Sequence, residues 1–154
     1  MDKTLIWNEE IINAINSRIV ALRESLHGYE WYVWDEIPEE FKMSFYENEG
    51  EINPNNLGYD EWLVNLTRRP NPLFSVVVYE GRVVASVSSG NPPGMGRMIN
   101  LWHVNNEHRG KGLGKMVILN ILHVLYNSEP TNNITAWDIT SQEVNQFLVS
   151  IGFT

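Results

Sequence analysis

Apolar residues recur at helical spacing near the start of the chain. Between Asn8 and Gly28 most of them lie three or four residues apart, at Ile11, Ile12, Ile15, Ile19, Leu22 and Leu26. Asparagine is a favoured helix N-cap and glycine is common just past a helix end, so this pattern predicts one amphipathic helix. Residues 4–7, ahead of this helix, favour a short strand.

The next segment mixes aromatic, acidic and turn-forming residues. Aromatic side chains alternate weakly over 29–34, and we expect them either to wall a ligand pocket or to pack in the core. Residues 35–46 predict a turn and then a helix with a proline in its first turn. Residues 47–58 are polar and rich in Asn, Pro and Gly, which indicates a loop. Residues 60–69 predict a short helix stopped by a proline.

The second half of the chain is richer in strands. Two β-branched runs, 74–79 and 83–87, flank Glu80-Gly81-Arg82, which is a clear hairpin signal. The rest alternates strand-like and helix-like runs, at 98–104, 116–126, 134–139 and 141–150. The order predicts a mixed α/β domain with a mostly antiparallel sheet, in which 98–104 and 134–139 form one parallel pair.

Length and composition bound the class of protein. The chain has 154 residues, 43% of them hydrophobic, which suits one globular domain spanning 1–154. The absence of cysteine excludes disulfide bonds and thiolate chemistry and fits a reducing compartment. The first residues lack the pattern of a secretory leader, and the longest apolar helix is too short to span a bilayer. We therefore expect a soluble, cytoplasmic protein with no membrane partner.

The net charge of −8 is unevenly distributed. Residues 1–70 contain 14 acidic and 6 basic residues, whereas residues 71–154 contain 5 of each. This balance argues against nucleic acid as a partner, because nucleic-acid binding needs a cationic face. The acidic half either favours a cationic acceptor such as an amine or simply makes surface helices soluble.

Residues 108–115, His-Arg-Gly-Lys-Gly-Leu-Gly-Lys, lie between a predicted strand and a predicted helix. Glycine at three alternate positions lets backbone N–H groups approach a ligand closely. The free donors and dipole of the helix N-terminus favour an anion, and Arg109, Lys111 and Lys115 add positive charge. The segment predicts a cradle for a pyrophosphate; the alternative is a glycine-rich turn in an ordinary strand–helix connection.

Spacing separates this segment from other phosphate-binding loops. In a Walker A loop the spacing would be one residue longer, and Met116 stands where the metal-binding hydroxyl is needed. In a dinucleotide-binding loop the third glycine would fall at Val117. The remaining pattern is Arg-x-x-Gly-x-Gly, formed by Arg109, Gly112 and Gly114 after the strand Leu101–Val104.

This pattern resembles the signature of the GNAT superfamily of acyl-CoA-dependent N-acetyltransferases. A second block agrees with it, since a predicted strand over 134–139 and a helix over 141–150 are followed by Gly152-Phe153. The resemblance covers about 73–154. It implies a GNAT-like sheet with one splayed parallel pair, an acceptor-side region over 1–72 and a CoA-binding core over 73–154.

The resemblance also implies acetyl-CoA as the cofactor. By position, pantetheine pairs with the backbone of 102–104, the pyrophosphate lies on 109–115, and Ser141 opens the last helix as an asparagine often does in the family. The cofactor-binding residues implied are Trp102, His103, Val104, Arg109, Gly110, Lys111, Gly112, Leu113, Gly114, Lys115 and Ser141.

The catalytic residues match the family less well. Strand 98–104 lacks the usual carboxylate, and Leu148 stands where many members have a tyrosine that protonates the leaving thiolate. His103 and Asp138 are the candidate catalytic bases, with a structural histidine and a helix cap as the alternatives. No metal site is predicted. We expect direct acetyl transfer to a primary amine of a small molecule or peptide, or else a degenerate domain that binds CoA or a protein without turnover.

The end of the chain departs from the family too. Family members normally continue past the Gly-Phe pair with two more strands, whereas this sequence stops at Thr154. Three explanations are open: a truncated chain, strands supplied by a partner, or a sheet with an open edge. Because an open edge promotes pairing between chains, we expect a homodimer or low stability.

Overall fold

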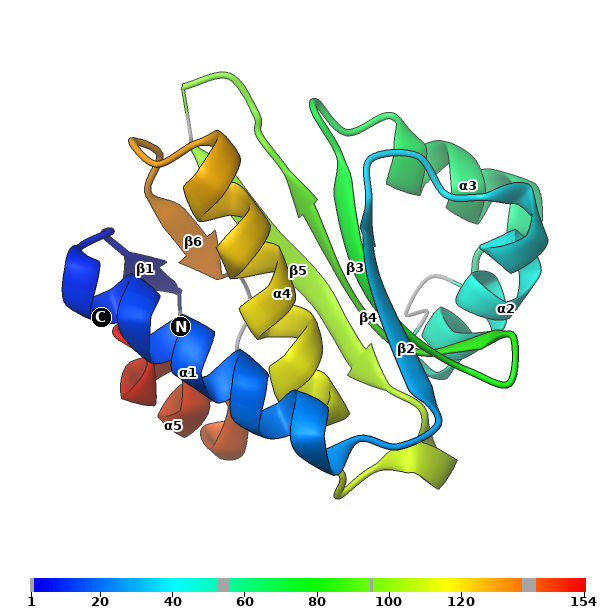
Figure 1. The fold of residues 1–154 in the computed structure, drawn as a ribbon. Helices are drawn as coiled ribbons and strands as arrows, with labels where there is room; N and C mark the ends of the chain where they lie inside the picture. The colour runs from blue at the N-terminus through cyan, green and yellow to red at the C-terminus, as the bar shows by residue number, and fades with distance from the viewer. Residues whose placement is uncertain (1, 53–55, 95, 137–140) are drawn as a thin grey trace.

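The computed structural model describes residues 2–52, 56–94, 96–136 and 141–154. Six strands form one mixed sheet in the order β1-β6-β5-β4-β3-β2, with helices on both faces (Figure 1). The elements are β1 (Lys3–Leu5), α1 (Glu9–Ser25), β2 (Tyr29–Trp34), α2 (Glu39–Glu49), α3 (Tyr59–Thr67), β3 (Leu73–Tyr79), β4 (Arg82–Gly90), β5 (Arg97–Val104), α4 (Leu113–Ser128), β6 (Ile134–Ala136) and α5 (Gln142–Ser150), with short 3₁₀ helices at Gly50–Ile52 and Asn106–His108.

The predicted parallel pair is confirmed. β5 and β6 run parallel with Arg97 opposite Ile134 and Ile99 opposite Ala136, and every other strand pair is antiparallel. Among the described residues, β5 from Asn100 to Val104 has no β6 partner. The 137–139 part of the predicted second strand lies outside the described residues.

An open edge beside the second parallel strand, one of the three explanations considered, is not observed. β1 pairs antiparallel with β6, with Leu5 opposite Ile134, so the N-terminal residues occupy this edge. The other side of β1 exchanges two backbone hydrogen bonds between Thr4 and Thr154, each 2.9 Å long. Both ends of the chain therefore meet at one side of the sheet. The homodimer stays a prediction.

Two apolar layers hold the helices against the sheet. One lies under α1, α4 and α5, and α4 is buried on nearly all sides, which explains its almost continuous apolar sequence. The other lies under α2 and α3. The aromatic side chains of β2 divide between the layers: Tyr29 and Trp31 pack on the first, while Trp34 packs on the second. Tyr32 is 37% exposed, so three of the four aromatic side chains of β2 contribute to core packing.

The predicted loop over 47–58 is partly wrong. α2 continues through Glu49 and is followed by the 3₁₀ helix Gly50–Ile52. The polar composition was misleading because α2 buries polar side chains against the sheet. For example, the buried Ser44 Oγ accepts a hydrogen bond from the Val83 N–H of β4, at 3.0 Å. Pro38 is the N-cap of α2 rather than a residue of its first turn.

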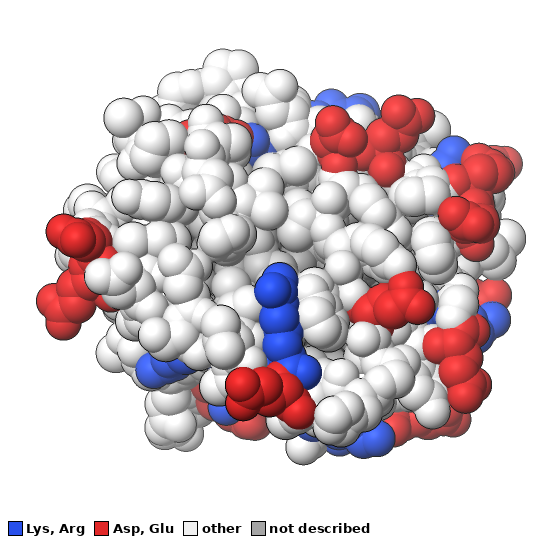
Figure 2. Space-filling model, viewed as in Figure 1, with Lys and Arg blue, Asp and Glu red and all other residues white. Residues whose placement is uncertain are grey.

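No helix among the described residues is long and apolar enough to cross a membrane. Acidic side chains gather over the side of the molecule where α2 and α3 lie (Figure 2), and both helices carry two acids in their first turns.

Candidate functional site

The glycine-rich segment adopts the backbone that its sequence requires. After β5 the chain makes the 3₁₀ helix Asn106–His108 and then passes through Gly110 and Gly112, whose φ angles are +81° and +86°. Only glycine enters this left-handed region readily, because a side chain would clash with the following carbonyl. Gly112 is the N-cap of α4.

The N-terminus of α4 presents backbone donors next to β5. The helical hydrogen bonds begin at Met116, whose N–H donates to the Gly112 carbonyl at 3.0 Å, so the N–H groups of residues 113–115 precede the helical ladder. A Cβ on Gly114 would lie 3.2 Å from Trp102 Nε1 and 3.2 Å from Val104 Cγ2. Glycine at this position therefore permits a close approach of α4 to β5.

The cations of this segment are positioned by neighbouring elements. Arg109 Nε donates to the Val104 carbonyl at 3.2 Å. Lys111 Nζ lies 5.8 Å from the Tyr29 ring centroid and Lys115 Nζ lies 5.7 Å from that of Phe147. The three positive charges therefore surround the start of α4. Ser141 caps α5, accepting the Val144 N–H at 3.4 Å.

A bulge interrupts β5 beside this loop. Ser86 lies opposite His103 and Ser88 opposite Asn100, so Leu101 and Trp102 together face the single residue Val87. Leu101 has φ +54°, an unusual value for a leucine. The bulge was not predicted, because nothing in the local sequence distinguishes Leu101 from a regular strand residue.

The bulge determines which way the candidate residues face. The Trp102 ring lies over the α4–α5 side, 6.1 Å from the Phe147 ring centroid. His103 faces the α2 side, where it is 6% exposed and its Nε2 is 2.9 Å from Glu51 Oε1. The predicted residues 102–104 and 109–115 thus lie together, whereas Asp138 lies outside the described residues.

Glu51 is the functional candidate that sequence reasoning missed. It falls in the segment predicted to be a loop and lies 52 positions from His103, so no local pattern could indicate the pair. The Asn106 N–H also donates to Glu51 Oε1, at 3.3 Å. Burial opposes ionisation, but the hydrogen bonds from His103 and Asn106 and the nearby charge of Arg109 lower the pKa of Glu51. Glu51, from the segment after α2, thus places a carboxylate beside His103 of β5.

A second carboxyl group, Glu49, is buried between α2 and α3. Trp62 Nε1 donates to Glu49 Oε2 at 2.8 Å, and Glu49 Oε1 has no hydrogen-bond partner. Burial raises the pKa of Glu49 to about 7, against the opposing effects of the Trp62 hydrogen bond and the Arg69 charge. The Glu49 carboxyl group therefore binds its proton more tightly in the folded state than in the unfolded chain.

This burial predicts a pH-dependent stability. The stabilising contribution of the Glu49 proton is complete below pH 4.5, the ordinary pKa, and is lost as pH rises through about 7. The Glu49→Gln variant keeps an acceptor for Trp62 without the charge. We expect it to increase the free energy of unfolding by about 3 kcal/mol at pH 8 and to change it little at pH 5. Urea unfolding at both values tests this, with the exposed Glu61→Gln as the control; equal effects at both pH values would contradict it.

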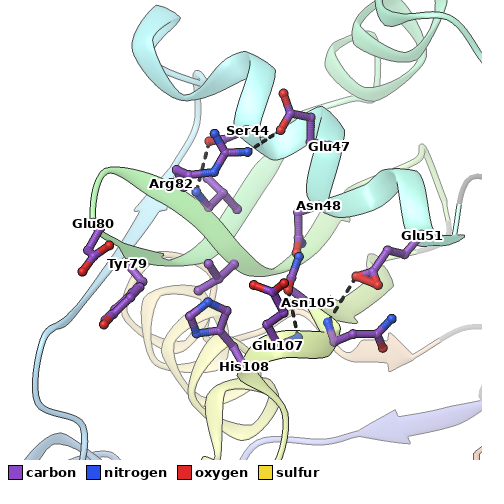
Figure 3. A pocket seen from close by; sticks show the side chains of 13 residues that line it. Ser44, Glu47, Asn48, Glu51, Tyr79, Glu80, Arg82, Asn105, Glu107 and His108 are labelled. Carbon is purple, nitrogen blue, oxygen red and sulfur yellow. Dashed lines mark hydrogen bonds and ion pairs between the residues drawn. The ribbon is translucent and has the colours of Figure 1, made fainter.

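Glu51 lines a cavity of about 600 Å³ (Figure 3), and its partner His103 is not among the lining residues. α2 forms one wall, the β3–β4 hairpin another, and residues 105–108 the third. Among the described residues, no group of three or more His, Asp or Glu side chains is placed to hold a metal ion.

Comparisons with known proteins agree with this geometry. The model of the acetyltransferase (GNAT) family matches residues 29–146. Escherichia coli ElaA is similar in structure, with a TM-score of 0.67 and 14% identity over 82% of this chain and 87% of its own. Glucosamine-6-phosphate N-acetyltransferase from Arabidopsis thaliana has a TM-score of 0.58 and 18% identity, over 79% of this chain and 90% of its own.

A third structure matches almost the whole chain. A tandem GNAT protein from the clavulanic acid biosynthesis pathway has a TM-score of 0.66 and 18% identity over 99% of this chain, which spans 48% of that protein. Comparison with curated sequences gives no match. A mixed sheet with one parallel strand pair and flanking helices is the architecture that this chain shares with these structures. Because the family model covers most of its length, the chain belongs to the GNAT acetyltransferase family.

Proposed function

We propose that this protein is an acetyl-CoA-dependent N-acetyltransferase that acts on a primary amine. The proposal rests mainly on the start of α4, where free backbone N–H groups and three cationic side chains lie together. This site is next to the part of β5 that has no β6 partner among the described residues. Anions bind well to such helix N-termini.

The residues present fit acetyl-CoA. The left-handed Gly110 and Gly112 and the close approach at Gly114 keep side chains away from the donors of α4. Residues 109–115 would hold the pyrophosphate, the backbone of 102–104 would pair with pantetheine, and Ser141 would lie at the start of α5. When bound, acetyl-CoA supplies an acetyl group activated as a thioester, with the coenzyme A thiol as leaving group.

In this proposal His103 takes the proton that the acceptor nitrogen loses. With Nε2–H donating to Glu51, the other ring nitrogen, Nδ1, is the basic one. An ionised Glu51 accepts this hydrogen bond and orients the imidazole, as a carboxylate does for a catalytic histidine. Asp138 remains the second candidate base in this proposal.

A binding domain without turnover is the second candidate function. It is favoured by Leu148, which is fully buried in the core at the position where many family members have a tyrosine. No hydroxyl is available at this position to protonate the leaving thiolate. Such a domain would bind CoA through the same glycine-rich loop, or bind a protein partner, without turnover.

Titration calorimetry with acetyl-CoA tests the cofactor site first, with ATP and NAD as controls. We expect acetyl-CoA alone to bind, and a hundredfold excess over Kd to raise the free energy of unfolding by about 2.7 kcal/mol. Release of free thiol on addition of an amine would then distinguish the enzyme from the binding domain. A folded chain that fails to bind acetyl-CoA would contradict the enzyme and leave only a domain that binds a protein without turnover.

A further inference from the structure

The cavity beside the Glu51–His103 pair is strongly acidic. Four carboxylates line it, from Glu47, Glu51, Glu80 and Glu107, and the one arginine, Arg82, forms an ion pair with Glu47. In Figure 3 the Glu51 and Glu80 side chains lie at opposite sides of the cavity, with Glu107 between them. Negative charge is therefore spread along the cavity rather than gathered at one point.

A buried oxygen in the wall of this cavity lacks a hydrogen-bond donor. Asn48 is 2% exposed and points from α2 toward the 105–108 segment (Figure 3). Its Nδ2 donates to Ser86 Oγ at 3.3 Å, while its Oδ1 has no partner. Leaving such a group unsatisfied costs about 1–3 kcal/mol, and an amide oxygen can only accept. The wall therefore offers a free acceptor to a ligand that donates an N–H or O–H group.

Apart from Ser44, Asn105 and Asn106, the remaining lining of the cavity is apolar or aromatic. Val83 and Val84 lie on one side, and the Tyr79 and His108 rings pack with their centroids 5.1 Å apart. His108 Nδ1 is already hydrogen bonded to the Tyr29 hydroxyl, at 2.9 Å. An aliphatic chain can lie against these surfaces while its charged ends reach the carboxylates.

We propose that this cavity binds the acceptor and selects a linear aliphatic diamine or polyamine that carries at least two positive charges. This inference rests on the proposed function. One amine would lie at the Glu51 end, next to His103, and the second ammonium at Glu107 and Glu80. An ammonium group has three donors, one of which can satisfy Asn48 Oδ1. A phosphorylated amino sugar would be repelled by the same carboxylates.

Binding is measured first without acetyl-CoA, by calorimetry with 1,4-diaminobutane, 1-aminobutane and glucosamine 6-phosphate. We expect the diamine to bind about tenfold more tightly than the monoamine, and its affinity to fall as the salt concentration is raised. Glucosamine 6-phosphate is expected not to bind. The double variant Glu80→Gln/Glu107→Gln should weaken diamine binding about tenfold. The matched control Asp60→Asn/Glu61→Gln, on α3 and equal in net charge, should leave it within twofold.

Thiol release from acetyl-CoA with the same three amines separates this inference from the proposed function. Acetylation of the diamine in preference to the other two supports both. Equal or better use of glucosamine 6-phosphate or the monoamine overturns the inference and leaves the N-acetyltransferase intact. If no amine is acetylated but the diamine binds and depends on Glu80 and Glu107, the cavity assignment stands and the enzyme assignment fails. Equal binding of diamine and monoamine, or an unaffected double variant, overturns the cavity assignment whatever the turnover.

Discussion

Replacing Gly112 with valine is expected to abolish acetyl-CoA binding while the chain still folds. Gly112 has φ +86° and is the N-cap of α4, so it sets the direction of the first N–H groups of that helix. A β-branched residue is strained in this region, and its Cβ would lie 2.9 Å from Leu22 Cδ2. We expect acetyl-CoA Kd to rise at least about a hundredfold, corresponding to about 2.7 kcal/mol.

Gly81→Val provides the matched control. Gly81 has a similar φ of +77°, lies in the β3–β4 hairpin, and has no atom within 4 Å of an added Cβ. Both variants should lower the free energy of unfolding by about 2 kcal/mol, because each forces a side chain into the left-handed region. Only Gly112→Val should lose acetyl-CoA. Calorimetry and urea unfolding measure the two effects, and retained binding in folded Gly112→Val would remove the loop from the cofactor site.

The features that could be predicted from the sequence are those fixed by local chemistry. The helix from Asn8, the β3–β4 hairpin and the glycine-rich loop each depend on residues a few positions apart, and all three are observed. The Asn8 side chain caps α1 by accepting the Ile11 N–H at 2.8 Å. The alternating glycines indicated a tight backbone before α4, because few other residues adopt the φ angle of +86° observed at Gly112.

The features that escaped prediction depend on contacts between distant residues. Leu5 pairs with Ile134 across 129 positions, and a three-residue strand carries too weak a pattern to reveal its partner. The bulge at Leu101 results from the register of β4 against β5 rather than from a turn residue. Likewise, α2 was cut short in the prediction because its last turn buries Asn48 and Glu49, which a hydrophobic pattern assigns to solvent.

The pairing of His103 with Glu51 is the basis of the acid–base role proposed for the candidate site. A histidine on a strand is most often structural, so the residue type alone could not decide between the two roles. The structure places its Nε2 on a carboxylate at 2.9 Å, and the hydrogen bonds to that carboxylate lower its pKa. Because the folded-state pKa of Glu51 is lowered, the stability this pair contributes is present above the ordinary glutamate pKa and is lost as pH falls below it.

The largest effect on turnover is expected at His103. His103→Gln keeps a polar side chain of similar size but removes the basic nitrogen, so kcat should fall about 10²–10⁴-fold while acetyl-CoA Kd stays within twofold. Glu51→Gln removes the charge that orients the imidazole and should lower kcat about tenfold. If the two residues act as one unit, the double variant will be little worse than His103→Gln, because Glu51 then acts only through His103.

Steady-state kinetics of thiol release and calorimetry of acetyl-CoA binding measure these effects separately. Glu61→Gln, an exposed acid on α3, serves as the control for loss of one negative charge. Normal turnover in His103→Gln would assign the histidine a structural role, held by Glu51 against the sheet, and would leave Asp138 as the candidate base. Strict additivity of the two single losses would instead mean that Glu51 acts on the acceptor itself, from the wall of the cavity that it lines.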